Sequence, residues 1–390
     1  MKILLITMEY PPMQGGVGNY YFNLVQNLSN VEVAVLINEE IPNNKLPISK
    51  KFQITNSQFQ IFRRIFFYKY FWPKWIKLFF EVRKLVKKEK PDLIWVGQVL
   101  PVGTVAFFIK KFLKVPYFAS VHGMDIMLPQ KSLRKEKLMM RVLKSAVFIT
   151  ANSEFTKKQL LNLEMEDGKI EVVYPCSHVS RNAYHVTDEK INEIRNGLGL
   201  QNKQILLTVG RLVERKGQDK VIEAMSQLVK EFPNLMYLII GNGPEAGNYK
   251  FQITNNKLQD KIKIISNVSD EKLPIFYQLA DIFIMPARNI AGDVEGFGIV
   301  YLEAGSFGLP VIAGRSGGAK ESVIDGQNGI LVNPESVVEI KDSIKKLLKD
   351  DNLRNKLGEQ GRIRSAEFKW EVQAEKIIDK INPTPFQHQY

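Results

Sequence analysis

Cysteine is nearly absent from this chain, since Cys176 is the only one among 390 residues. A single thiol cannot form a disulfide within the chain. Long apolar runs are lacking as well: no stretch of about eighteen apolar residues is free of charge, so we expect no membrane-spanning helix. The opening run Ile3–Thr7 is too short for a signal-peptide core before Glu9 and Pro11 interrupt it. These absences predict a protein of the reducing cytoplasm.

What the chain does contain is enough for two domains. With 390 residues, 45% of them hydrophobic and 24% charged, it exceeds what one hydrophobic core usually organises. Short apolar runs alternate with helical patterns in two blocks, which predicts an α/β fold of two Rossmann-like domains with parallel sheets. The runs are Ile3–Thr7, Val31–Ile37, Leu93–Val96, Tyr117–Val121 and Val147–Thr150, then Ile205–Val209, Tyr237–Gly241, Ile262–Ile265, Ile282–Pro286, Val311–Ala313 and Ile330–Val332.

The two blocks also indicate where the domains begin and end. We expect an N-terminal domain over residues 1–178 and, after a polar connection with a lead-in helix, a C-terminal domain over residues 200–365. The stretch from Val337 to about Leu357 is expected to be helical. A last helix at about 368–382 is expected to pack back on the N-terminal domain, and residues 383–390 to form a mobile tail.

Basic and aromatic residues concentrate between Ile61 and Lys90. The net charge of +13 favours anionic partners, and after Pro73 apolar residues recur at helical spacing with basic residues between them. Such a helix can lie among anionic lipid headgroups, or its apolar stripe can pack on the sheet with its lysines in water. The preceding aromatic run favours the membrane, so we expect peripheral association with the inner face of the cytoplasmic membrane. The expected membrane surface comprises Arg63, Arg64, Lys69, Trp72, Lys74 and Trp75. No nucleic-acid partner is expected, because no nucleic-acid-binding module is recognisable.

A glycine-rich turn, Gly15–Gly18, lies between the first strand and the first helical pattern. Glycines at such a position let backbone N–H groups approach a phosphate, although they can also serve a plain tight turn. Glu39 and Glu40 near the second strand would fit a dinucleotide-binding fingerprint, but Tyr21 stands where that fingerprint has its third glycine.

Two charged clusters occur in the second block. Arg211 and Lys216 follow its first strand, at the edge where α/β sheets bind ligands, and could stabilise a departing diphosphate. A solvated basic turn would give the same pattern. Glu295 and Glu303 could accept hydrogen bonds from ligand hydroxyl groups, or both could lie on the surface.

Taken in order, these motifs resemble those of glycosyltransferase family 4 over nearly the whole length, to about residue 335. The matching residues are Gly15–Gly18, His122 with Gly123, Arg211 with Lys216, Gly241–Glu245, and Glu295 with Glu303. The resemblance implies the GT-B architecture, in which the parallel sheets of two Rossmann-like domains face a central cleft. Within the family, Asp293–Gly318 is most similar to bacterial phosphatidylinositol mannosyltransferases and related hexosyltransferases. Lys320 stands where those commonly have proline.

The resemblance also implies residue roles. Arg211 and Lys216 would bind the departing diphosphate, and His122 would lie beside the sugar. Glu295 would hold the sugar and Glu303 the ribose. The catalytic set is then Arg211, Lys216, His122 and Glu295, and the donor-binding set is Gly15, Gly16, Gly243, Val268, Gly296, Phe297, Gly298 and Glu303. No Asp-x-Asp motif and no adjacent nucleophile–base pair is present, so we expect no metal and no cofactor.

The expected function is transfer of a hexose, with retention of configuration, from a nucleotide-diphosphate sugar to a lipid-linked or membrane-proximal glycan. Mannose from GDP-mannose is the first expectation, and a UDP-sugar donor with a soluble acceptor is the alternative. An NAD-dependent oxidoreductase would not need the charged clusters. A non-catalytic nucleotide-sugar-binding protein is disfavoured by the intact motifs.

Overall fold

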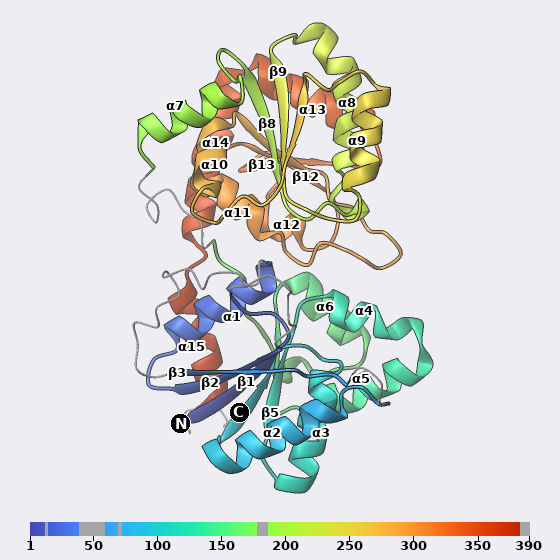
Figure 1. The fold of residues 1–390 in the computed structure, drawn as a ribbon, viewed down its shortest axis with the longest axis vertical. Coiled ribbons are helices and arrows are strands. Elements are labelled where there is room, and N and C mark those ends of the chain that lie inside the picture. Colours follow the sequence, from blue (N-terminus) through green and yellow to red (C-terminus); the bar gives the residue numbers. More distant parts are fainter. Residues whose placement is uncertain (12–14, 39–58, 69–71, 178–185, 383–390) are drawn as a thin grey trace. The chain divides into compact units, whose positions relative to one another are not determined.

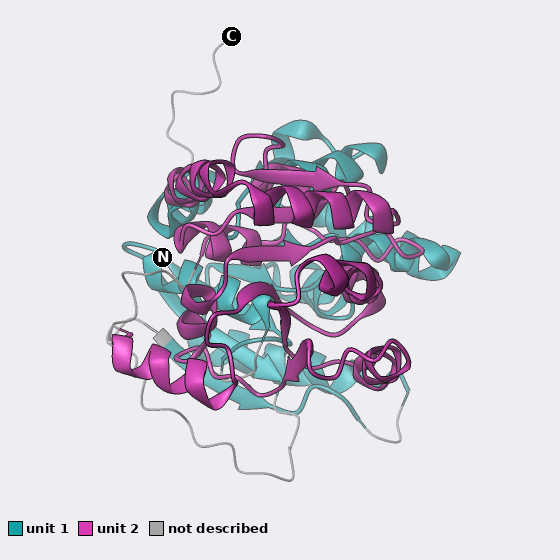
Figure 2. Ribbon diagram, turned by 90° about the horizontal axis from the view of Figure 1, so that it is seen from above, with its two compact units in different colours: residues 1–175, 369–390 teal, residues 176–368 magenta. Residues whose placement is uncertain are grey.

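A computed structural model of the chain describes residues 1–390 except 12–14, 39–58, 69–71, 178–185 and 383–390 (Figure 1). The chain divides into two compact units, residues 1–175 with 369–390 and residues 176–368 (Figure 2). The expected domains fall within these units except for residues 176–178, which belong to the second. The expected tail at 383–390 and the pair Glu39 and Glu40 lie outside the described residues.

The first unit contains a parallel sheet in the order β3-β2-β1-β4-β5-β6-β7. Its strands are β1 (Lys2–Thr7), β2 (Glu32–Asn38), β3 (Phe59–Arg64), β4 (Leu93–Val96), β5 (Tyr117–Val121), β6 (Ile149–Ala151) and β7 (Ile170–Val172). Every residue of the central strand β4 is buried, as expected for a parallel sheet covered by helices. The strand order reverses between β1 and β4, and α/β sheets bind ligands beyond the strand ends at such a reversal.

The helices of the first unit include one from the far end of the chain. They are α1 (Gly16–Asn27), α2 (Ile76–Glu89), α3 (Val102–Leu113), α4 (Met124–Met127), α5 (Leu133–Ser145), α6 (Glu154–Asn162) and α15 (Trp370–Ile381). α15 lies against α1 (Figure 1). Its Gln373 side chain accepts a hydrogen bond from the Tyr174 backbone N–H at 2.8 Å, and Ala374 and Ile377 are fully buried. These contacts explain why the last helix belongs to the first unit.

The second unit contains a parallel sheet in the order β10-β9-β8-β11-β12-β13. Its strands are β8 (Gln204–Val209), β9 (Leu235–Ile240), β10 (Ile262–Ile265), β11 (Ile282–Met285), β12 (Val311–Gly314) and β13 (Gly329–Val332). Ile205 and Leu207 of β8 enter one hydrophobic core, and Leu206 enters another. This alternation is what a strand buried on both faces produces.

The helices of the second unit follow the expected alternation with strands. They are α7 (Asp188–Gly197), α8 (Gln218–Glu231), α9 (Ala246–Asn255), α10 (Leu273–Leu279), α11 (Ile299–Ser306), α12 (Ala319–Ser322), α13 (Val337–Lys349) and α14 (Asp351–Ala366). In the part of the chain that the structure describes, no helix is long and apolar enough to cross a membrane.

The structure adds details that the sequence expectation lacked, among them the edge strand β7 at Ile170–Val172. Residues 59–64 form the edge strand β3, which sequence reasoning missed because paired cations end this short apolar run. The stretch from Val337 to about Leu357 is helical as expected except at Asp350, where α13 has ended and a second helix begins. Asp350 adopts an extended backbone, and its side chain accepts a hydrogen bond from the Leu353 N–H at 2.8 Å. This N-cap starts α14 as a separate helix.

Candidate active site

Four loops of the second unit gather at one edge of its sheet, because the carboxyl ends of parallel strands point the same way. They follow the adjacent strands β9, β8, β11 and β12. The sequence assigns Lys216, Gly243 and Glu295 to the site, and each lies in one of these loops. This edge is the candidate ligand site of the second unit.

A compact cluster of charges lies in the loops after β8 and β11. The Lys216 Nζ atom is 2.5 Å from the Glu295 Oε2 atom, and the Arg215 Nη1 atom is 2.6 Å from the same oxygen. The Arg215 Nε atom is also 2.8 Å from the Asp293 Oδ1 atom. Lys216 and Glu295 are each only 8% exposed. Two cations therefore share one buried carboxylate oxygen.

The cluster keeps Glu295 ionised. Burial alone would raise the pKa of Glu295, but the attraction of Lys216 and Arg215 outweighs burial and lowers this pKa to about 2. The ammonium group of Lys216 carries further N–H donors besides the one used by Glu295. The cluster thus holds a fixed carboxylate beside cations that can still bind an anion.

Sequence reasoning assigned Arg211 and Lys216 together, and the structure gives them different surroundings. Lys216 belongs to the buried cluster, whereas Arg211 is exposed at the end of β8. Its backbone oxygen accepts a hydrogen bond from the Gln218 side chain at 3.2 Å. Arg215 is the residue that the sequence analysis missed. Its charge within the same loop was the available signal, but only the fold shows that it meets Glu295.

The loop after β12 packs against the loop that carries Glu295 and donates a hydrogen bond to it. The Gly318 N–H donates to the Glu295 backbone oxygen at 2.9 Å. A Cβ atom at Gly318 would lie 2.0 Å from the Gly296 oxygen, so only glycine allows this approach. Phe297 is 2% exposed, and its ring packs edge-on against Phe368. Its side chain is therefore part of the core. Any contact with the sugar-nucleotide donor would come from the backbone between Gly296 and Gly298.

Glu303 lies in α11, and its carboxylate is buried. The Tyr277 hydroxyl, from α10, donates to the Glu303 Oε2 atom at 2.8 Å. Burial and the nearby Glu303 carboxylate both raise the pKa of Tyr277 well above its ordinary value, so this hydroxyl stays protonated and donates. Tyr277 is a further residue that the sequence analysis missed. The structure places Glu303 with Tyr277.

The remaining predicted residues of the second unit lie after β9 and β10. Gly243 follows β9, and a Cβ atom there would lie 2.2 Å from the Leu212 oxygen. The loops after β8 and β9 can therefore touch, and the Leu212 N–H donates to the Asn242 oxygen at 2.8 Å. Val268 follows β10 and packs half-buried against the core.

The first unit places a different chemistry at its strand ends. His122 follows β5, and its Nε2 atom is 2.6 Å from the Tyr21 hydroxyl. Burial lowers the pKa of His122 to about 4, so the ring is neutral at physiological pH. The backbone N–H of His122 donates to the Asp125 carboxylate at 2.9 Å, and burial raises the pKa of Asp125 to about 7. Gly15 and Gly16 begin α1, where Gly16 is exposed with open space around it.

The residues assigned to the membrane surface have mixed placements. Arg63 and Arg64 end β3, and Trp72 is 85% exposed. Lys74 is exposed, whereas Trp75 is half-buried and stacks on Phe108 of α3. Lys69 lies outside the described residues.

The apolar stripe of the predicted helix packs inward, as the alternative interpretation held. Leu78, Val82, Leu85 and Val86 of α2 are buried in the core of the first unit.

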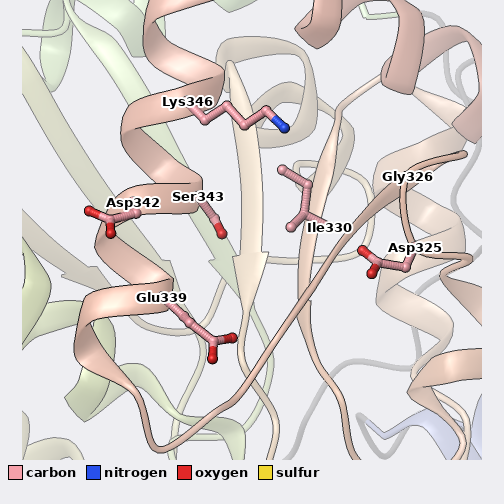
Figure 3. Close-up of a pocket in the computed structure, with 7 residues that line it drawn as sticks. All are labelled: Asp325, Gly326, Ile330, Glu339, Asp342, Ser343 and Lys346. Carbon is pink, nitrogen blue, oxygen red and sulfur yellow. The ribbon is translucent and has the colours of Figure 1, made fainter.

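A surface pocket of about 400 Å³ lies between β13 and α13 (Figure 3). Its lining residues are Asp325, Gly326, Ile330, Glu339, Asp342, Ser343 and Lys346. The Asp325 carboxylate accepts from the Leu331 N–H at 2.8 Å, and the Glu339 carboxylate accepts from the Asn333 N–H at 2.7 Å. Both carboxylates thus accept hydrogen bonds from backbone N–H groups. The pocket contains none of the predicted site residues.

Comparisons with known proteins decide the family. Residues 190–364 match the model of group 1 glycosyl transferases, and residues 14–181 match the model of Glycosyltransferase Family 4. The chain belongs to glycosyltransferase family 4. The charged cluster and Glu303 of this transferase lie within the first match, and His122 lies within the second.

Relatives and solved structures extend over nearly the whole transferase. It is 25% identical to the GDP-mannose-dependent alpha-(1-6)-phosphatidylinositol monomannoside mannosyltransferase of Mycolicibacterium smegmatis, over 97% of this chain and 98% of the relative. It is 28% identical to the monoacylated-substrate enzyme of Corynebacterium glutamicum, over 98% of each. Sucrose-phosphate synthase from Thermosynechococcus elongatus has a TM-score of 0.82 at 21% identity, covering 98% of each chain. Anabaena HepE in complex with UDP-glucose has a TM-score of 0.80 at 20% identity, covering 98% of this chain and 100% of HepE. The fold is GT-B.

Proposed function

We propose that this transferase moves a mannosyl group, with retention of configuration, from GDP-mannose to a lipid-linked glycan of the phosphatidylinositol mannoside type. The buried Lys216–Glu295 pair at the strand ends carries the proposal, because it combines a cation for a diphosphate with a carboxylate for sugar hydroxyl groups. The donor and acceptor are supported by the names of relatives that match nearly the full chain. A UDP-linked hexose is the second candidate donor, favoured by the UDP-glucose complex of a structural neighbour.

The leaving diphosphate would meet Lys216 and the exposed Arg211. Negative charge grows on the diphosphate as its bond to the sugar breaks, and cations already in place stabilise that charge without reorganising. Glu295, which Arg215 also binds, holds Lys216 in position before any donor arrives. The proposed chemistry therefore needs no metal ion, since the two cations neutralise the diphosphate.

The ribose of the donor would bind Glu303. Tyr277 occupies one side of its carboxylate through a 2.8 Å hydrogen bond and fixes its orientation. A carboxylate oxygen accepts more than one hydrogen bond, so a ribose hydroxyl can share this group.

The acceptor would be reached from an anionic membrane, through a surface of the first unit. We define this aromatic surface as Trp72, Phe80 and Phe112, which are 85%, 53% and 63% exposed. Phe79 links the last two, since its ring packs edge-on against both of theirs. Exposed Lys74, Arg83 and Lys84 lie on or beside the same helix α2. Aromatic side chains beside cations suit the headgroup region of anionic lipid.

Sugar transfer tests the chemical part of the proposal. The purified chain is incubated with GDP- and UDP-sugars, first alone and then with vesicles that contain phosphatidylinositol mannoside. We expect slow hydrolysis of GDP-mannose alone and faster transfer with the vesicles. Preference for a UDP-sugar would select the second donor, and no turnover of any sugar nucleotide would contradict both.

Vesicle co-sedimentation tests the membrane part. We expect binding to anionic vesicles at low salt and release at high salt. Vesicle binding should weaken in a variant with Trp72, Phe80 and Phe112 changed to Ser. It should also weaken in a second variant with Arg63, Arg64, Lys69 and Lys74 changed to Ser. The control is Phe251→Ser, which removes a 70% exposed aromatic from the second unit. Equal binding by all variants would show that this surface does not contact lipid.

A further inference from the structure

Two tyrosines of α1 enclose the ring of His122. The ring centroids of Tyr20 and Tyr21 lie 5.1 Å and 5.4 Å from that of His122, and both pairs meet edge to face. Tyr21 is completely buried, and its ring also packs edge-on against Trp95 of β4. The neighbours of Tyr21 thus leave its hydroxyl little freedom to move.

The Tyr21 hydroxyl carries a single proton and lies close to a carbonyl oxygen and to an imidazole nitrogen. Its oxygen is 2.6 Å from the Gly97 carbonyl oxygen and 2.6 Å from the His122 Nε2 atom. A carbonyl oxygen can only accept, so the Tyr21 proton must point to Gly97. A proton aimed at His122 would leave two oxygen atoms 2.6 Å apart with no hydrogen between them.

The remaining partner, Nε2 of His122, must then be the donor. A neutral imidazole carries its proton on only one nitrogen, so a proton on Nε2 leaves the lone pair on Nδ1. Burial disfavours a second proton on this ring, consistent with its pKa of about 4. The hydrogen bonds around Tyr21 thus determine which ring nitrogen of His122 can accept a hydrogen bond.

We propose that Tyr21 is a positioning residue that holds His122 as the neutral, Nε2-protonated tautomer, so that Nδ1 accepts a hydrogen bond from a hydroxyl group of the donor sugar. The sugar contact rests on the proposed function, whereas the tautomer does not. His122 then recognises a hydroxyl group and supplies no proton to the reaction. A sugar that lacks that hydroxyl leaves a buried acceptor unpaired and is discriminated against.

The tautomer can be measured without any donor. The full chain contains four histidines, so a long-range ¹H–¹⁵N spectrum of ¹⁵N-histidine-labelled protein gives few ring signals. The set lost in His122→Gln identifies His122. We expect a protonated Nε2 and an unprotonated Nδ1 in the wild type at pH 7. Tyr21→Phe should change this to a mixture of tautomers.

Tyr20→Phe is the matched control. The Tyr20 hydroxyl donates to the Val173 oxygen at 3.1 Å and not to His122, although its ring touches the same imidazole. Its spectrum should show the wild-type tautomer. A wild-type His122 protonated on Nδ1 would overturn the proposal even if Tyr21→Phe failed to fold. An unchanged tautomer in folded Tyr21→Phe would also overturn it.

Donor hydrolysis then tests the sugar contact. Tyr21→Phe and His122→Gln should each lower kcat/KM for the donor by roughly tenfold, the effect of one lost hydrogen bond. The double variant should lose little more than His122→Gln, because Tyr21 acts through His122. Fully additive losses would show that Tyr21 acts elsewhere. A correct tautomer with no hydrolysis at all would leave the tautomer standing and contradict the proposed function.

Discussion

The two units use similar parallel sheets but place opposite chemistries at the strand ends. The second unit gathers charge, with Arg215 and Lys216 sharing the ionised carboxylate of Glu295. The first unit presents a neutral ring, His122, held by the Tyr21 hydroxyl. Charge suits a diphosphate and neutral hydrogen bonding suits a sugar hydroxyl. The sheet therefore supplies the position, and the loop residues decide which kind of ligand group each unit can bind.

The largest expected effect comes from removing a charge from the second unit. Lys216→Ala should lower turnover roughly a hundredfold or more, because a preorganised cation no longer meets the developing diphosphate charge. Arg211→Ala should have a comparable effect without disturbing the buried cluster. Steady-state donor hydrolysis measures both.

The control for this prediction is Lys220→Ala. Lys220 lies in α8 soon after Lys216, and its only recorded ion pair among the described residues is a 3.9 Å contact with Glu335. It should keep near wild-type turnover. Normal turnover in correctly folded Lys216→Ala would show that the charged cluster of the second unit does not stabilise the departing diphosphate.

A smaller effect is expected at the ribose contact. Glu303→Ala should raise the donor KM more than it lowers kcat, because a contact far from the reacting bond is similar in the ground and transition states. Tyr277→Phe should do the same more weakly, by roughly threefold to tenfold, since it removes only the hydrogen bond that orients Glu303. A loss confined to kcat would rule out this role.

The two units should also differ in how acid changes their stability. Glu295 has a pKa of about 2, below its ordinary 4.5. The unfolded chain therefore takes up this proton first, and stability falls as pH drops from about 4.5 to about 2. Glu295→Gln should flatten the loss in that window. Chemical denaturation at a series of pH values measures the change.

In the first unit, His122 and Asp125 change the stability of the fold in opposite directions as pH varies, at higher pH than Glu295 does. His122 has a pKa of about 4, below its ordinary 6.5, so its contribution falls as pH drops from about 6.5 to about 4. Asp125 has a pKa of about 7, above its ordinary 3.8, so the folded chain takes up its proton first and its contribution rises as pH drops from about 7 to about 4. His122→Gln should therefore gain stability relative to the wild type on acidification from pH 6.5 to 4. A relative loss in that window would show that His122 is protonated in the fold.

Much of this arrangement could be predicted from sequence, for local reasons. The strand-ending glycines, Lys216 and Glu295 lie in short motifs next to apolar runs, and parallel strand ends bring such motifs to one edge. Tyr21 and Tyr277 could not be found this way, because each acts on a residue from a different element of the fold. Sequence alone also left two interpretations open for the helix after Pro73. Helical spacing identified the stripe of α2 but could not show that Leu78 and Val82 face the core.

The central claim is that cations of the second unit, and no metal ion, stabilise the departing diphosphate. Hydrolysis of GDP-mannose by the wild type and by Lys216→Gln, each with and without EDTA, tests it most directly. The account predicts that the wild type keeps its turnover in EDTA, whereas Lys216→Gln loses it in either condition. Complete loss of wild-type turnover on chelation, restored by magnesium or manganese, would contradict the claim.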